Sequence, residues 1–165
     1  MGLALGSIPA RLLVIVAISV AVSWAVVLVY FPYAQREAIQ FRSISWAQGS
    51  THPTRDNLII NDQTTWVSVW GEIAGNNSFN PLPQVNFGNT TLIAAFAGTE
   101  PSAGYALNVT SITKTSTHVE VQITLVVPGQ NCIEAAMLSS PYHIVEVPKI
   151  SLPVEFRTQT STTSC

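Results

Sequence analysis

The sequence predicts an α+β protein, in which a mainly antiparallel β domain with one helix follows a single transmembrane helix. Three observations support this: an uncharged apolar run near the N-terminus, helical spacing of apolar residues after residue 61, and alternating apolar residues in several segments beyond residue 90. The chain has 165 residues, of which only 10% are charged. Soluble proteins carry about 25% charged residues, so the composition favours membrane contact or extensive burial.

The apolar run covers residues 12–31 and contains no charged side chain. As a helix rising 1.5 Å per residue, it would span roughly 30 Å, the thickness of the hydrocarbon core of a bilayer. Tyr30 and Tyr33 lie where aromatic side chains meet the membrane interface, and Pro32 would end the helix. A buried core helix is the alternative, but the remaining chain is too short to cover it on all sides. We therefore expect membrane lipid to surround this segment.

A cleaved signal peptide is the second alternative for this segment. Its apolar region is normally about 7–15 residues long and is followed by a cleavage site with small residues. Here the run is longer, and Pro32 and Tyr33 make a poor cleavage site. The sequence therefore favours an uncleaved anchor.

The orientation follows from the segment after the helix. Positive charges are almost balanced on the two sides, so they decide little. The C-terminal part, however, contains three glycosylation sequons, at Asn76, Asn89 and Asn108. We expect a single-pass protein of the cell membrane, with its N-terminus cytoplasmic and its C-terminal domain extracytoplasmic.

These features divide the chain into five regions. The predicted regions are a flank at residues 1–11, the membrane helix at 12–31, a linker at 32–43, a β-rich domain at 44–157 and a disordered Thr/Ser tail at 158–165.

Within the domain, one segment has helical spacing and the others alternate. Asn61 or Asp62 offers an N-cap, and the helical face that follows consists of Trp66, Val69, Trp70 and Ile73. Residues 91–97 are apolar on both faces, as in a central strand, and residues 118–127 alternate regularly. The full set of expected strands is 44–47, 58–60, 91–97, 105–112, 118–127, 142–147 and 152–156, with a helical turn or irregular crossing at 133–138.

No arrangement of polar residues predicts catalysis or a cofactor. No two acidic residues form a close pair, Gly-x-Ser-x-Gly does not occur, and no glycine-rich phosphate loop is present. The three histidines are scattered and C-x-x-C is absent, so we expect no metal site. With a net charge of -2 and no basic stripe, the chain is not expected to bind nucleic acid. We therefore predict a protein that is not an enzyme and binds no small-molecule cofactor.

The two cysteines, Cys132 and Cys165, leave three possibilities open. Outside the cytoplasm they are able to form a disulfide that holds the C-terminal tail against the domain. Cys165 is also suited to bridging two chains, and both residues are compatible with free thiols.

One loop has the composition of a recognition element. Gly98 and Gly104 permit positive φ at its two ends, and Pro101 stiffens its middle. A preorganised loop on a rigid sheet loses little entropy on binding. An ordinary structured hairpin is the alternative, and Tyr105 also fits a core position. The predicted partner-binding residues are Gly98, Thr99, Glu100, Pro101, Ser102, Ala103, Gly104 and Tyr105, together with Pro141 and Tyr142 of a neighbouring turn.

Several motifs in order carry a family resemblance. A helix with two tryptophans precedes Pro83-Gln84-Val85-Asn86-Phe87, then Pro101-Ser102-Ala103-Gly104-Tyr105, and finally the run PYHIVEVPK at residues 141–149. Over residues 58–149 this order resembles the PrcB C-terminal domain family. The sequence departs from the family pattern at Asn86, where the family has Asp, and at Ser102 and Ala103, where it has Thr and Gly.

The resemblance implies an accessory or binding module rather than an enzyme. The namesake of the family is a surface lipoprotein that associates with a secreted protease complex and helps to stabilise it, and the domain has no established catalytic residues. A protein partner, such as a protease complex, is thus expected here, although this chain has an apolar helix in place of a lipid.

Two other functions remain as alternatives. The segment Pro101 to Tyr105 is similar to a loop of chagasin-like peptidase inhibitors, but Glu100 stands where that family has Asn. A structural protein of the cell envelope, acting through glycans or self-association, is the other alternative.

Overall fold

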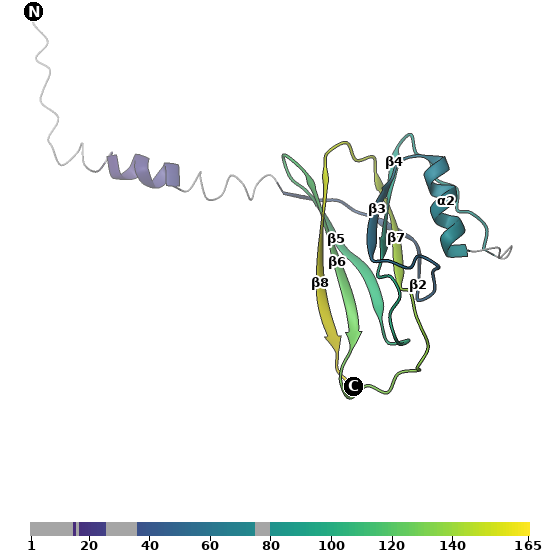
Figure 1. Cartoon of the computed structure of the whole chain (residues 1–165). Helices are drawn as coiled ribbons and strands as arrows, with labels where there is room; N and C mark the ends of the chain where they lie inside the picture. The colour runs from purple at the N-terminus through teal and green to yellow at the C-terminus, as the bar shows by residue number, and fades with distance from the viewer. Residues whose placement is uncertain (1–14, 16, 26–35, 75–79) are drawn as a thin grey trace, which may run out of the picture. The chain divides into compact units, whose positions relative to one another are not determined.

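The computed structural model describes residues 15, 17–25, 36–74 and 80–165, and the chain forms two compact units, residues 1–36 and 37–165 (Figure 1). In the first unit, residues 17–25 are helical, and the Ser23 hydroxyl donates a hydrogen bond to the Ser19 carbonyl over 2.9 Å. Most of the remaining predicted span of residues 12–31 lies outside the described residues. Among the helices that the structure does describe, none is both long and apolar enough to cross a membrane. The transmembrane helix remains a prediction.

The second unit is mainly β and contains two four-stranded sheets. Sheet A has the order β1-β5-β6-β8, and its strands are β1 (Glu37–Ala38), β5 (Ala106–Lys114), β6 (Val119–Pro128) and β8 (Val154–Thr163). Sheet B has the order β2-β7-β4-β3, and its strands are β2 (Arg42–Ala47), β7 (Tyr142–Pro148), β4 (Thr90–Phe96) and β3 (Asp56–Ile60). All neighbouring strands are antiparallel except β6 and β8, which are parallel.

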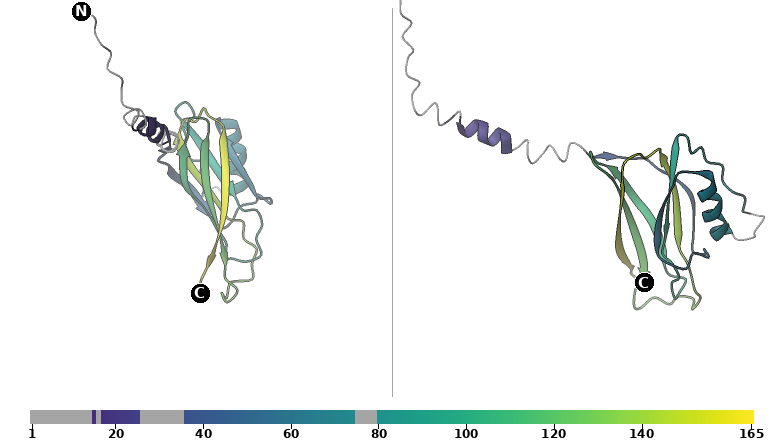
Figure 2. Two further views of the ribbon diagram at one scale, coloured as in Figure 1. Left: turned by 90° about the vertical axis from the view of Figure 1, so that its left-hand side faces the viewer. Right: turned by 45° about the horizontal axis from the view of Figure 1, so that its top comes forward.

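The two sheets and α2 (Gln63–Ala74) form three layers, with sheet B in the middle (Figures 1 and 2). One apolar core lies between the sheets and includes Ile93 and Val145 of sheet B and Val121 and Ile123 of sheet A. A second core lies between sheet B and the helix. This arrangement explains why residues 91–97 are apolar on both faces, because β4 is covered on both sides.

The helix forms where the apolar spacing predicts it. Asp62 caps it, since its carboxylate accepts hydrogen bonds from the backbone N–H and the hydroxyl of Thr65, at 2.9 and 2.8 Å. Trp66 and Trp70 are buried against sheet B, and their indole N–H groups donate to backbone carbonyls of the segment after the helix. Near the other end, the Thr51 N–H and hydroxyl both donate to the Glu72 carbonyl, which helps to satisfy the last turn.

Three features differ from the sequence prediction. The segment predicted as a disordered tail, residues 158–165, instead continues β8 to Thr163, because the β-branched threonines pair with β6. The predicted linker at 32–43 already contains β1 and the start of β2. The strands of the predicted, mainly antiparallel domain are divided between two sheets, one of which contains a parallel pair, and local alternation does not reveal this division.

Candidate functional site

The predicted recognition loop, residues 98–105, connects β4 of sheet B to β5 of sheet A. Its first residue, Gly98, has a φ of +78°, a conformation that side chains with a Cβ rarely adopt. A Cβ at this position would also lie 2.8 Å from the backbone nitrogen of Arg55. The loop therefore leaves the sheet in a direction that requires glycine, against the segment 53–55.

The loop is held on this side by Arg55. Its guanidinium contacts the Glu100 carboxylate over 3.1 Å and the Ala97 carbonyl over 3.4 Å. The Thr99 N–H donates to the Pro53 carbonyl over 3.3 Å. Only 14% of the Glu100 side chain is exposed, so this carboxylate fastens the loop and is not a free contact group.

On its other side, the loop pairs with the segment 134–139. Glu100 and Ser139 exchange two backbone hydrogen bonds, at 2.8 and 3.0 Å, as in a one-residue antiparallel ladder. The Ser139 hydroxyl donates to the Ser102 carbonyl over 2.6 Å, and the Ala103 N–H donates to the Ala135 carbonyl over 3.2 Å. Main-chain and side-chain bonds from two separate segments therefore fix the loop, so it is preorganised.

The predicted contact residues fall into exposed and buried groups. Thr99 and Pro101 are exposed, and residues 102–105 are partly buried. In contrast, Pro141 and Tyr142 are buried, and Tyr142 belongs to the apolar core between sheet B and α2. Tyr142 is only 4% exposed, and its hydroxyl is hydrogen-bonded to the Ser45 hydroxyl over 2.9 Å. These two residues lie inside the domain and offer no surface to a partner.

An apolar segment that the sequence did not identify lies beside the loop. Ile133, Met137 and Leu138 are 101%, 59% and 72% exposed, and all belong to the connection between β6 and β7. The same connection supplies the carbonyl of Ala135 and the backbone of Ser139 that hold the recognition loop. Loop 98–105 and the segment 133–138 therefore form one composite surface, which we call the distal surface.

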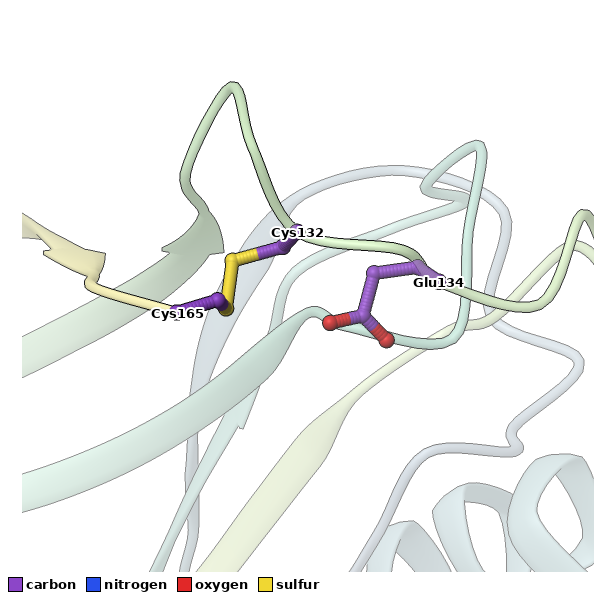
Figure 3. A group of neighbouring side chains, drawn as sticks. All are labelled: Cys132, Glu134 and Cys165. Atoms are coloured by element: carbon purple, nitrogen blue, oxygen red, sulfur yellow. A yellow bond between two sulfur atoms is a disulfide. The ribbon is translucent and has the colours of Figure 1, made fainter.

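A disulfide between Cys132 and Cys165 joins the C-terminus to the start of this segment (Figure 3). The two Cα atoms are 5.3 Å apart, and both cysteines of the chain are engaged. The Glu134 carboxylate lies close to both sulfurs, within 4.8 Å, so these three residues are the one group in the described part of the chain with the proximity for metal binding. With the sulfurs bonded to each other, the two thiolates that a metal would need are absent.

A cavity of about 370 Å³ lies at the opposite end of the domain, where β1 and the connection between β7 and β8 meet. Apolar side chains such as Ile39, Val119 and Leu152 line it, beside Glu37 and Lys114. It is remote from loop 98–105 in the sheet, because β5 runs from that loop to Lys114. Nothing in its lining selects a particular cofactor.

The three sequons occupy different positions. Asn89 is exposed in the turn before β4, and Asn108 lies partly exposed within β5. Asn76 lies outside the described residues. A glycan on Asn89 would project from a turn, whereas one on Asn108 would lie over sheet A.

His143 has a structural role in the interior of the domain. His143 is 7% exposed; its Nδ1 accepts a hydrogen bond from the Val109 N–H over 2.9 Å, and its Nε2 is 2.8 Å from the Ser43 hydroxyl. Burial lowers the pKa of His143 below its ordinary value of 6.5, which favours the neutral ring that this acceptor role requires. At the helix, the hydrogen bonds from Thr65 hold the pKa of Asp62 below its usual 3.8.

Comparison with known proteins relates the centre of this domain to one family. Residues 91–148 match the family model described as PrcB C-terminal, which covers β4, β5, β6, β7 and the distal surface. No match was found among curated proteins or among solved structures. The resemblance seen in the sequence is therefore confirmed for residues 91–148, which match the PrcB C-terminal domain family.

Proposed function

We propose that the domain is an extracytoplasmic protein-binding module, held at the cell membrane by the apolar N-terminal segment. Its partner is a protease or another complex of the cell envelope, and its role is that of an accessory protein rather than an enzyme. The observation that carries this proposal is the distal surface, where a preorganised loop stands beside three exposed apolar side chains.

The physical chemistry of the distal surface suits protein recognition. Large apolar side chains on a surface cost solvation free energy, so their grouping on one connection favours burial against a partner. Since hydrogen bonds to Pro53, Ala135 and Ser139 already order the adjacent loop, binding there loses little further conformational entropy. Thr99 and Pro101 supply the exposed residues of that loop.

Two observations support the location and the partner class. The disulfide between Cys132 and Cys165 is typical of an oxidising compartment, which supports an extracytoplasmic domain. The match of residues 91–148 to the PrcB C-terminal family supports a protease-associated role by analogy.

The test is affinity purification of the full-length protein, tagged at its N-terminus, from gently solubilised native membranes. Mild crosslinking and mass spectrometry then identify partners and the residues that contact them. The double substitution I133S/L138S removes two exposed apolar side chains of the distal surface, and we expect it to abolish the crosslinked partner. Val67→Ser is the matched control, because Val67 is 51% exposed on α2, away from this surface.

Two other results would replace this proposal. Retention of every partner by I133S/L138S would show that the distal surface is not the contact site. Stoichiometric inhibition of a cysteine peptidase by the protein would indicate a chagasin-like inhibitor. An intact complex that dissociates in I133S/L138S but not in Val67→Ser supports the accessory module.

A further inference from the structure

The two sheets have four edge strands, and β8 differs from the other three. β1 has two residues, β3 has five, and β2 is interrupted by a register shift between Ser43 and Ser45. Short edges and bulges of this kind discourage pairing with another chain. β8 has ten residues and pairs with β6 in unbroken register from Val154 to Thr163 (Figure 2, left).

The groups that β8 presents outward follow from its parallel pairing. The Val119 N–H donates to the Pro153 carbonyl over 2.8 Å, and Val119 pairs with Val154. In a parallel ladder, alternate residues of one strand bond to the same neighbour. Odd-numbered residues of β8 therefore bond to β6, whereas the N–H and C=O groups of the even-numbered residues point to the free edge. These are Val154, Phe156, Thr158, Thr160 and Thr162.

Nothing in β8 protects this edge. It contains neither proline nor lysine, the residues that most often block an edge strand. Its two charges, Glu155 and Arg157, lie near its start and contact each other over 3.4 Å. Residues 157–163 are all exposed, and no described strand pairs with their outer edge.

We propose that β8 pairs antiparallel with β8 of a second copy of this chain, which joins two copies of sheet A into one eight-stranded sheet. A two-fold axis relates the copies, so the same edge serves both. The charges restrict the register. An axis at Arg157 would set two arginines opposite each other, and an axis at Glu155 would do the same for two glutamates.

A two-fold axis at Thr158 or at Thr160 avoids both conflicts between like charges. With the axis at Thr158, Glu155 lies opposite Ser161 of the second copy, and Arg157 lies opposite Gln159. With the axis at Thr160, the paired segment is uncharged apart from Arg157. Threonines then face each other across the junction, a pairing that is favourable between antiparallel strands. The uncharged, threonine-rich half of β8 is thus complementary to itself.

Self-pairing through β8 is independent of the proposed function. β8 lies outside the family match at residues 91–148, and the pairing uses no residue of loop 98–105 or of the segment 133–138. One pair of edge strands buries less surface than a permanent dimer, so we expect reversible association that depends on concentration.

The first test is hydrogen exchange by NMR on the uniformly labelled full-length chain in mild detergent, over a hundredfold range of concentration. Amides of Phe156, Thr158 and Thr160 should exchange rapidly in dilute samples and become at least about tenfold slower in concentrated ones. Amides of Arg157 and Gln159 should be protected throughout, because they bond to β6. Outward amides that stay unprotected at the highest concentration would overturn the proposal.

The second test is sedimentation of the full-length chain and two variants. Thr160→Pro removes an outward N–H without removing a bond to β6, and in a two-fold dimer it acts twice, so self-association should weaken by about tenfold or more. Thr160→Val keeps the N–H and should associate like the parent. Equal association of all three proteins would overturn the proposal. If Thr160→Pro fails to fold, hydrogen exchange of the outward amides in the parent chain still tests the proposal.

Discussion

The Nδ1 atom of His143 in sheet B accepts a hydrogen bond from the Val109 N–H of sheet A, over 2.9 Å. This buried bond joins the two sheets. Val109 directly precedes the register shift in the pairing of β5 with β6, so the bond satisfies a donor at an irregular point of the ladder. The two sheets are thereby fixed in relative position by a polar contact as well as by apolar packing.

Removal of this contact should destabilise the domain. His143→Ala leaves the Val109 N–H buried without its acceptor, and such a donor costs about 1–3 kcal/mol in addition to the packing that is lost. Chemical unfolding followed by tryptophan fluorescence measures the change. Ser43→Ala removes only the contact at Nε2 and should cost less; an equal loss in both variants would show that the Val109 bond is unimportant.

His143 should also make stability depend on pH. Its pKa is below 6.5 in the folded protein because of burial, and about 6.5 in the unfolded chain. Below pH 6.5 the unfolded state therefore binds more protons, and the free energy of unfolding should fall as the pH drops from 7 towards the folded pKa. His143→Gln should lack this component. A parent protein whose stability is flat over this range would contradict the expected protonation.

Asp62 should make stability depend on pH in a more acidic range than His143 does. Hydrogen bonds from Thr65 lower its folded pKa below 3.8, so its contribution is complete above pH 3.8 and disappears as the pH falls through the folded pKa. Asp62→Ala should lower the midpoint of thermal unfolding at pH 7, and Asp62→Asn should retain most of the stability because Asn also caps helices. Circular dichroism melts of the three proteins test this order.

Gly98 and Gly104 provide a matched pair of substitutions in the recognition loop. Gly98→Ala places a Cβ at positive φ and against the backbone at Arg55, and we expect a loss of about 1–3 kcal/mol. The three atoms nearest to a Cβ at Gly104 all belong to the flexible side chain of Glu134, which is able to move, so Gly104→Ala should cost less. Urea unfolding of both variants measures the two losses of unfolding free energy. A larger loss for Gly104→Ala than for Gly98→Ala would contradict this geometry.

Loss of the disulfide should loosen the C-terminal part of the domain. The bond closes a loop with a sequence separation of 33, for which chain entropy predicts about 2–4 kcal/mol. Replacing both cysteines with serine should lower the free energy of unfolding by this amount and speed exchange of the last amides of β8. On a non-reducing gel the parent protein should migrate as a single chain, because its disulfide lies within one chain.

The sequence predicted those elements whose cause is local. The capping carboxylate of Asp62 and the spacing of Trp66 and Trp70 identify α2, and the alternation from Val119 onwards identifies β6. The apolar composition of β4 indicated burial on both faces. In each case the residues within one element are sufficient evidence.

What the sequence did not reveal depends on distant partners. The sequence predicted a strand at 152–156, but not its continuation to Thr163. That continuation depends on β6, a parallel neighbour more than 30 residues away in the sequence, with no intervening turn to indicate the pairing. Tyr142 was predicted to be a contact residue, but it packs in the apolar core between sheet B and α2. Ile133 and Leu138 acquire their significance only from the loop to which their neighbours are hydrogen-bonded.

The direction of β5 places the first strand of the domain and loop 98–105 at opposite ends of the domain. The domain begins with β1, which pairs with the last residues of β5. Loop 98–105 leads into the first residue of β5, which is about 30 Å from the last along an extended strand. The C-terminus lies beside loop 98–105 because Cys165 is joined to Cys132. A purification tag or reporter fused after Cys165 would thus crowd the surface formed by loop 98–105 and its neighbours.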